Sequence, residues 1–336
     1  ELPARRGLEL VLRGRDLHGA RGRAGVSTAL EATVAVPPLP LAEWQDTRDT
    51  LHLWTQIVGK TRLALAPMVN HWWNVPLYVS ARGLTTSRMP YGTSGFSVEL
   101  DFIDHQLVVR RDDGRTWTTP LAARSVADFY RDYMAGLRSI GIDVRIWPVP
   151  VEIANPIPFA EDETHASYDA EAARRFWRAL AQADRVLQIF RGRFTGKSSP
   201  VHFFWGSFDL ACTRFNGSRA PLHPGGVPGL ADWATREAYS HCCISAGWWP
   251  GTVGGPVAEP AFYAYAYPEP EGCPTAPIRP AAGYYQGQMH EWVLSYDAVR
   301  DSADPDRDAL AFFQSTYEVA ATLGGWDRAS LERAGS

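Results

Sequence analysis

Hydrophobic residues recur at helical spacing in four segments of the chain. After an Asp/Thr start near residue 46, Leu51, Trp54, Ile57 and Val58 fall on one face, and Pro67 ends the pattern. The other three amphipathic patterns cover residues 125–140, 168–194 and 306–323. Ser125 precedes its segment as an N-cap residue and Gly141 follows it, which is typical of a helix with both ends marked. We therefore expect four helices.

Alternating apolar and polar residues between these helices predict β-strands. In the first part of the chain they cover residues 71–82, 96–102, 107–111, 115–119 and 143–147, with an Asp113-Gly114 turn. In the second part they cover residues 201–215, 238–248, 261–267 and 291–296. Short strands joined by turn residues indicate antiparallel sheets rather than alternating βαβ units.

The order of helix, four strands and helix thus occurs twice, separated by a proline-rich stretch over residues 148–166. His71-Trp72-Trp73 opens the first strand of one half, and His202-Phe203-Phe204 opens that of the other. We expect an α+β protein with a flexible extension over residues 1–36, halves over 37–147 and 167–330, and a linker over 148–166. The two pseudo-repeated halves would form either a barrel-like sheet or two packed sheets.

Composition restricts the class of function. The formal charge of -4 offers no basic field for nucleic acid, and no apolar run approaches the roughly 18 residues of a spanning helix. Four irregularly spaced cysteines form no disulfide framework, and no secretory signal pattern is present, so we expect a cytoplasmic protein with reduced thiols. The thirteen Trp, thirteen Tyr and fourteen Phe residues are many for this length and indicate an aromatic-lined cavity.

Common nucleotide-binding, metalloprotease and serine hydrolase motifs are missing from the sequence. Strand alternation instead selects candidates that share faces. One face of the first strand carries Trp72, Asn74, Tyr78 and Arg82, and one face of residues 201–215 carries Trp205, Ser207 and Asp209. An aspartate on an aromatic face is costly unless it is paired, so Asp209 is either a catalytic group or a partner of Arg82 or Arg214. A tyrosine stripe that begins at Tyr263 is a further ligand-binding candidate.

Histidines raise the question of a metal site. His71, His202 and His241 all fall on predicted strands, but His71 and His202 share faces with apolar residues, which favours buried, hydrogen-bonded histidines over ligands. His241 lies beside Cys242 and Cys243, yet neighbouring strand residues point to opposite faces, so it is poorly placed to activate either thiol.

Long motifs in the chain resemble an uncharacterised bacterial family that is known only as a domain of unknown function. They are the runs of residues 70–86 (NHWWNVPLYVSARGLTT), 200–210 (PVHFFWGSFDL) and 262–270 (FYAYAYPEP). The resemblance extends from about Pro38 to the C-terminus and implies no activity, cofactor or catalytic residue. Many members have an acidic residue where this chain has Cys242, and that departure weakens a metal site at His241.

These observations predict a small-molecule enzyme with an aromatic-lined polar cleft between two similar halves. Asp209 or His241 would transfer protons, and Arg82 or Arg214 would hold an anionic substrate group. The remaining binding residues would be Trp72, Asn74, Tyr78, Trp205, Ser207 and Tyr263. The alternatives are a non-catalytic binding or sensor protein that uses the same cleft, and an interaction protein with an exposed aromatic patch. The sequence does not identify a cofactor or an oligomeric state.

Overall fold

Helices form where the apolar periodicity predicts them. The computed structural model describes residues 36–333, so residues 1–35 of the predicted extension lie outside the described residues. Its α-helices are α2 (Gln45–Leu65), α3 (Val126–Ser139), α4 (Ala170–Gly192), α5 (Asp232–Ala238), α6 (Tyr296–Arg300), α7 (Pro305–Leu323) and α8 (Arg328–Leu331). Short 3-10 turns occur at η1 (Leu41–Glu43), η2 (Asn70–Trp72), η3 (Phe159–Glu161) and η4 (Cys273–Thr275). No helix within the described residues has both the length and the apolar character needed to cross a membrane.

Capping residues explain where the helices begin. The Ser125 side chain accepts a hydrogen bond from the Asp128 amide at the start of α3, as its position in the sequence predicts. Asp169 caps α4 in the same way, and Asp304 caps α7 ahead of Pro305 in the first turn. At the end of α2, Ala66 is extended in front of Pro67, because a residue before proline disfavours the helical conformation.

The strands build two antiparallel six-stranded sheets that do not close into a barrel. The first sheet has the order β1-β2-β4-β5-β6, with β3 paired to β4, and the second has the order β11-β12-β10-β9-β8-β7. The strands of the first are β1 (Tyr78–Val79), β2 (Gly83–Thr85), β3 (Met89–Tyr91), β4 (Ser94–Asp101), β5 (Gln106–Arg111) and β6 (Thr116–Pro120). Those of the second are β7 (His202–Phe204), β8 (Asp209–Arg219), β9 (His241–Trp249), β10 (Ala261–Tyr267), β11 (Tyr284–Gln286) and β12 (Glu291–Ser295).

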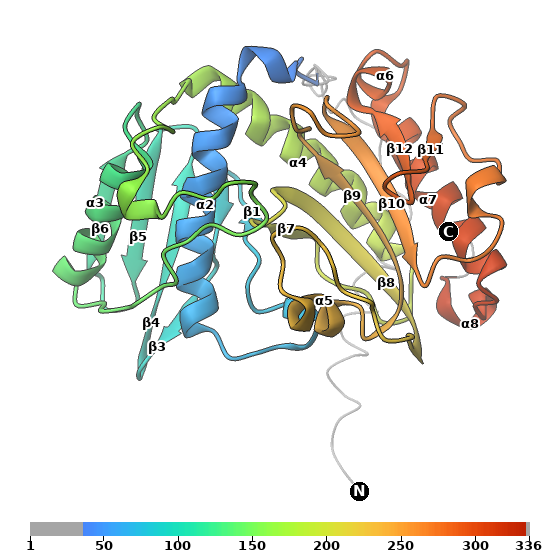
Figure 1. Ribbon diagram of the computed structural model, residues 1–336, viewed down its shortest axis with the longest axis horizontal. Coiled ribbons are helices and arrows are strands. Elements are labelled where there is room, and N and C mark those ends of the chain that lie inside the picture. Colours follow the sequence, from blue (N-terminus) through green and yellow to red (C-terminus); the bar gives the residue numbers. More distant parts are fainter. Residues whose placement is uncertain (1–35, 334–336) are drawn as a thin grey trace, which may run out of the picture. The chain divides into compact units, whose positions relative to one another are not determined.

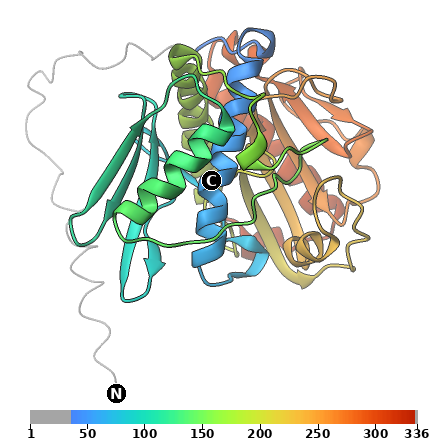
Figure 2. The same ribbon diagram turned by 60° about the vertical axis from the view of Figure 1, so that its left-hand side comes forward.

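The two sheets meet at their edges through one residue pair. Leu77, next to β1, and Phe203 of β7 exchange both backbone hydrogen bonds, each 2.9 Å long. Helices α2 and α3 cover the first sheet, with α3 lying against β6 (Figure 1 and Figure 2). Helices α4 and α7 cover one face of the second sheet, and α5 with the segment leading to it lies on the opposite side (Figure 1).

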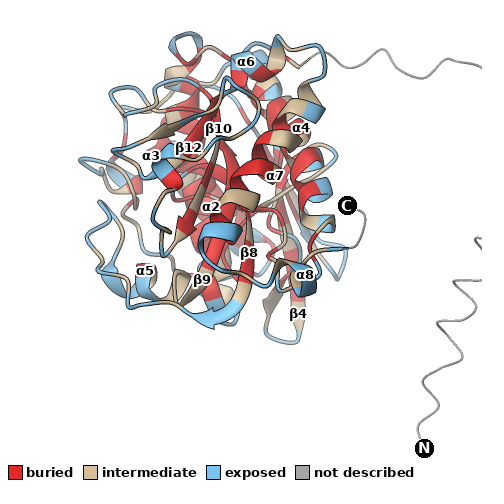
Figure 3. Cartoon of the chain, turned by 90° about the vertical axis from the view of Figure 1, so that its right-hand side faces the viewer, coloured by how far each residue is buried: buried red, intermediate tan, exposed pale blue. Residues whose placement is uncertain are grey.

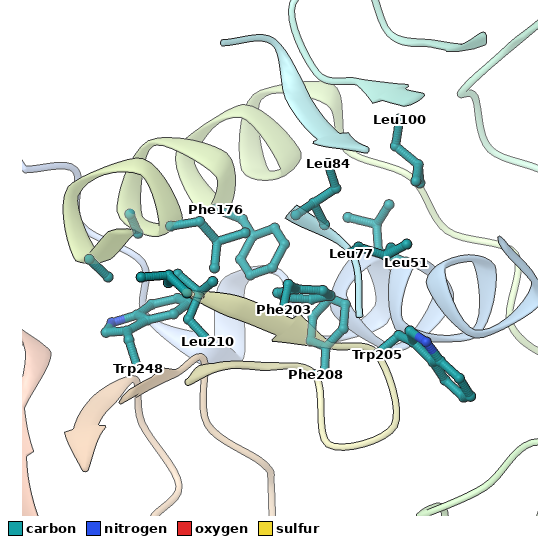
Figure 4. Packing of buried hydrophobic residues seen from close by; sticks show 14 of the residues in the cluster. Leu51, Leu77, Leu84, Leu100, Phe176, Phe203, Trp205, Phe208, Leu210 and Trp248 are labelled. Atoms are coloured by element: carbon teal, nitrogen blue, oxygen red, sulfur yellow. The ribbon is translucent and has the colours of Figure 1, made fainter. Parts of the chain in front are cut away.

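One hydrophobic core connects both sheets with the helices that cover them. Phe176 of α4 packs against Phe203 and Phe208, with ring centroids 6.3 and 5.0 Å away (Figure 4). Trp205, from the turn between these two phenylalanines, points away from them towards α2 (Figure 4). Buried residues concentrate in the sheets and on the inward faces of the long helices, whereas α5 is mostly exposed or half-buried (Figure 3).

Three strand predictions are wrong in detail. Only residues 78–79 of the predicted strand over 71–82 are extended in a sheet, because His71 and Trp72 adopt left-handed conformations with φ of 59° and 61°. The predicted strand over 143–147 has no strand partner; the Tyr91 hydroxyl bonds the Asp143 amide at 2.8 Å instead. The segment over 201–215 is two strands, β7 and β8, separated by a turn.

Each half contains a six-stranded sheet with helices before and after it, but α5 interrupts the second sheet between β8 and β9, and the proposed sequence echo does not mark equivalent positions. His71 lies in the turn η2, while His202 begins strand β7. The internal pseudo-repeat therefore stays a prediction. Residues 148–166 contain only the short turn η3, in agreement with their proline content.

Candidate functional site

A cavity of about 750 Å³ lies on the face of the second sheet that α4 and α7 do not cover. Its walls come from residues 60–75, 147–152, 204–215, 227–245, 249–265 and 289–293. Most of its lining is apolar and aromatic, with tryptophans at 72, 73, 147, 205, 233 and 249. This size and lining fall within the usual range of small-molecule sites.

Strand alternation places the floor of the cavity. Residues two apart on a strand point to the same face, so β8 contributes Asp209, Ala211 and Thr213 to the cavity. By the same rule the cavity receives Ser245 from β9, Tyr263 and Tyr265 from β10, and Glu291 and Val293 from β12. The intervening residues pack into the core, for example Trp248 and Phe262.

Asp209 lies at the start of β8 with 8% of its surface exposed. Its carboxylate accepts hydrogen bonds from the Ser207 hydroxyl at 2.5 Å and from the Tyr263 hydroxyl. Burial raises the pKa of Asp209, while these two hydroxyl donors act in the opposite direction by stabilising the carboxylate. Asp209, Ser207 and Tyr263 thus lie together at the cavity, although Ser207 belongs to the turn before β8 and not to a strand.

Glu152 brings a second carboxyl group into the cavity from the proline-rich segment. It has a positive φ of 56°, and its amide donates to the Gly229 carbonyl at 3.1 Å. Its carboxyl group packs against the Cα atom of Gly206, where any larger residue would collide with it. Burial raises the pKa of Glu152 to about 7, and the charge of Asp209 adds to the shift.

Glu291 supplies a third carboxyl group as the first residue of β12. Burial raises its pKa to about 8, again with a contribution from Asp209. Three carboxyl groups from distant parts of the chain thus line one cavity with pKa values above their ordinary range. Burial is the larger cause at both glutamates, and the charge of Asp209 adds to the shift of each.

Lys60 faces the cavity from α2 and is only 3% exposed. Its ammonium lies over the rings of Trp205 and Phe159, 5.8 and 6.0 Å from their centroids. Within residues 36–333 no oxygen atom accepts a hydrogen bond from its Nζ and no carboxylate lies within 4 Å. Burial lowers the pKa of Lys60 to about 8.

Four of the eight predicted binding residues reach the cavity. Trp72, Trp205, Ser207 and Tyr263 line it together with Asp209. Two of them are fixed by indole hydrogen bonds of 2.9 Å: Trp72 donates to the Ala234 carbonyl, and Trp205 donates to that of Val75. The left-handed backbone at Trp72 is of the kind that concentrates at functional sites.

Two predicted binding residues, Asn74 and Tyr78, are placed outside the cavity lining. The side chain of Asn74 is buried and accepts a hydrogen bond from the Val69 amide at 3.2 Å. The ring of Tyr78 lies under the Arg62 guanidinium, 5.5 Å away.

The two arginines expected to hold an anionic group also lie outside the lining. Arg82 pairs with Asp101 at 2.5 Å and with Asp104 at 2.6 Å, and its backbone bonds Phe102 in the first sheet. Arg214 is fully buried on the opposite face of β8, over the ring of Phe190 at 3.5 Å. Burial lowers the pKa of Arg214 to about 10.

Of the three candidate metal ligands, His71 and His241 lie close together. His71 lines the cavity, but its Nδ1 bonds the Ala238 carbonyl and its Nε2 bonds Lys197, each at 3.0 Å. His241 is outside the lining, with its ring 5.4 Å from that of His71. His202 is buried, and burial lowers its pKa to about 3. Among residues 36–333, no group of three or more His, Cys, Asp or Glu side chains is arranged to hold a metal ion.

A family model described as a family of unknown function, DUF5996, matches residues 36–333. The chain belongs to this family. Neither the comparison with curated proteins nor that with solved structures finds a match. Membership in DUF5996 confirms the resemblance drawn from the sequence motifs and adds no activity to it.

Three residues of this DUF5996 site, Lys60, Glu152 and Glu291, are not among those selected from the sequence. Glu152 lies in the stretch interpreted as a linker. Glu291 is the first residue of a strand, and the alternation of apolar and polar residues does not by itself mark it as a site residue. Lys60 could have been selected from the sequence, because the chain contains only two lysines, Lys60 and Lys197.

Proposed function

We propose that the cavity is the active site of a small-molecule enzyme that works by general acid–base catalysis. The observation that carries this proposal is the convergence of Asp209, Glu152 and Glu291 in one aromatic cavity. Structural carboxylates are usually paired with a cation, whereas no arginine or lysine forms an ion pair with any of these three among the described residues.

The environments of the three groups favour different roles. With a pKa of about 8, Glu291 is protonated at neutral pH and is the general acid. Glu152, with a pKa of about 7, is half-ionised there and is the general base. Asp209 is held by Ser207 and Tyr263, and its charge raises the pKa of both glutamates.

The lining favours an uncharged substrate with planar or apolar parts. Tryptophan and tyrosine rings bind such surfaces, and the tyrosine hydroxyl groups orient polar substituents. An anionic substrate was expected from Arg82 and Arg214, but the cavity lining has three carboxyl groups against the single lysine Lys60. An additional negative charge on the substrate would be unfavourable there.

The test combines ligand binding with turnover. Uncharged aromatic and carbonyl-containing metabolites are screened by thermal shift, and each ligand found is incubated with the protein and analysed for products. We expect conversion by the wild type, at least a hundredfold slower conversion by Glu152→Gln and Glu291→Gln, and unchanged conversion by Glu43→Gln, which alters an exposed carboxylate.

The alternative is a non-catalytic binding protein that uses the same cavity. Ligands that bind the wild type and both glutamine variants, and are recovered unchanged from all of them, would establish that alternative.

A further inference from the structure

The two lysines of this chain are both associated with the cavity. The sequence has 33 Lys and Arg residues in total, and all except Lys60 and Lys197 are arginine. Lys60 lines the cavity, and the ammonium of the exposed Lys197 reaches His71 in its wall at 3.0 Å. Arginine serves as the cation elsewhere, so a lysine at position 60 points to a property that arginine does not have. That property is the ability to lose its proton and become a nucleophilic amine.

The surroundings of Lys60 fit that property. A structural lysine would have an acceptor or a carboxylate partner, but among the described residues Lys60 has neither. Its neighbours are the rings of Trp205 and Phe159, which stabilise a cation less than water does. Gly59 allows this arrangement, because a Cβ atom at that position would collide with the indole of Trp205.

We propose that Lys60 forms an imine with an aldehyde or ketone substrate bound in the cavity. This deepens the proposed function by naming the substrate class, and it rests on the assignment of the cavity as the active site. A carbonyl compound is uncharged, so it fits a cavity that holds three carboxyl groups and one amine. Burial, which lowers the pKa of Lys60 to about 8, leaves part of the amine neutral at physiological pH.

The chemistry requires only groups that line the cavity. The neutral Nζ attacks the carbonyl carbon, a C–N bond forms, and the carbonyl electron pair moves to oxygen, which takes a proton from a protonated glutamic acid. A carboxylate removes a proton from nitrogen, the hydroxyl group leaves as water after protonation, and a C=N bond forms. In total, one carbonyl compound, one neutral lysine amine and one proton from a glutamic acid give one protonated imine, one water and one glutamate.

Reductive trapping tests the proposal without any knowledge of the natural substrate. The full chain is incubated with 4-hydroxybenzaldehyde and sodium cyanoborohydride between pH 6 and 10, and the modified sites are located by peptide mass spectrometry. Because the chain has only two lysines, the labelling of Lys60 is read against Lys197 and the α-amino group. We expect Lys60 to be labelled about tenfold faster than Lys197 at pH 7.5, with its rate rising through pH 8.

Two variants serve as controls. Lys60→Arg retains the positive charge but cannot form an imine, so the fast labelling must disappear while the circular dichroism spectrum stays that of the wild type. The variant Lys197→Arg must retain the fast labelling of Lys60. Labelling of Lys60 no faster than of Lys197, or fast labelling that persists in Lys60→Arg, overturns the proposal.

The outcome for the carboxyl groups is separate. Trapping at Lys60 that proceeds equally in Glu152→Gln and Glu291→Gln would keep the imine and remove the acid–base roles. If these variants convert a substrate slowly and no trapping occurs at Lys60, the acid–base roles would be kept and the imine would be removed.

Discussion

The side-chain amide of Gln56 bonds both backbone groups of Val151, which is 95 residues away in the sequence. Its Nε2 donates to the Val151 carbonyl at 2.8 Å, and its Oε1 accepts from the Val151 amide at 2.9 Å. This pair fixes the irregular segment to α2 one residue before Glu152. One turn earlier on α2, His52 bonds the carbonyl of Gly206 at 2.8 Å. The Glu152 carboxyl group packs against the same glycine.

Replacing Gln56 should therefore release Glu152 from the cavity. We expect Gln56→Leu to lower the free energy of unfolding by about 1–3 kcal/mol, because two buried backbone groups lose their partner. Amide hydrogen exchange over residues 148–158 should accelerate more than elsewhere. Gln188→Leu removes an exposed glutamine of α4 and should change neither quantity. Equal exchange in both variants would show that Gln56 does not hold the segment.

The raised pKa of Glu291 makes stability depend on pH in a predictable direction. The pKa of Glu291 is about 8 in the folded protein and 4.5 for an ordinary glutamate, so the folded state binds more protons between these values. The contribution to stability is complete below pH 4.5 and is lost as the pH rises through 8. At pH 9 Glu291→Gln should be more stable than the wild type by on the order of 2–3 kcal/mol, allowing for solvent screening.

Urea unfolding of both proteins from pH 5 to 9 measures this difference. The comparison cancels titrating groups that do not interact with Glu291, such as His52, whose pKa burial lowers to about 3. The two stability curves should diverge as the pH rises. A difference that stays constant over this range would place Glu291 in contact with solvent.

Gly229 should tolerate no side chain, for a reason beyond its backbone angle. Gly226 and Gly229 have similar φ values of 78° and 72°, but only at Gly229 would a Cβ atom meet the backbone of Glu152, at 2.7 Å. Gly226→Ala should cost about 1–2 kcal/mol from the left-handed conformation alone. Gly229→Ala should cost clearly more and reduce turnover by moving Glu152. Chemical denaturation of both variants gives the comparison, and equal losses would contradict it.

Tyr263 controls the ionisation of Asp209. Its hydroxyl donates to the Asp209 carboxylate, so Tyr263→Phe removes a donor that favours the charged form and raises the pKa of Asp209 further. We expect a loss of about 1–3 kcal/mol in stability, which becomes smaller as the pH falls and the carboxyl group takes up a proton. Carboxyl-selective NMR should show the shifted titration. Tyr284→Phe, at an exposed position of β11, is the matched control.

The sequence predicts the long helices well because their signals are local. The apolar stripe of α2 and the Ser125 cap of α3 lie within a few residues of the structure they determine. Alternation likewise placed Asp209, Ser207 and Tyr263 on the cavity. It failed for residues 143–147, whose hydrogen bonds go to the side chain of Tyr91 rather than to a neighbouring strand.

Long-range contacts decide the remainder of the site. Glu152 reaches the cavity only because α2, the 205–208 turn and Gly229 hold its segment there, and none of these is near it in the sequence. Arg214 points to the opposite face from Asp209 because an odd number of strand positions separates them. Assigning Arg214 to the cleft therefore conflicted with the alternation rule.

The division of the cavity walls between the halves also limits how the gene can be recombined. Lys60 is encoded before the proline-rich segment, Glu152 within it, and Asp209 and Glu291 after it. A chimera that joins residues 36–147 of one family member to the remainder of another would take its amine from one parent and its carboxyl groups from the other. Residues 36–147 and the remainder of the chain must therefore come from the same parent wherever the amine and the acids act on the same ligand.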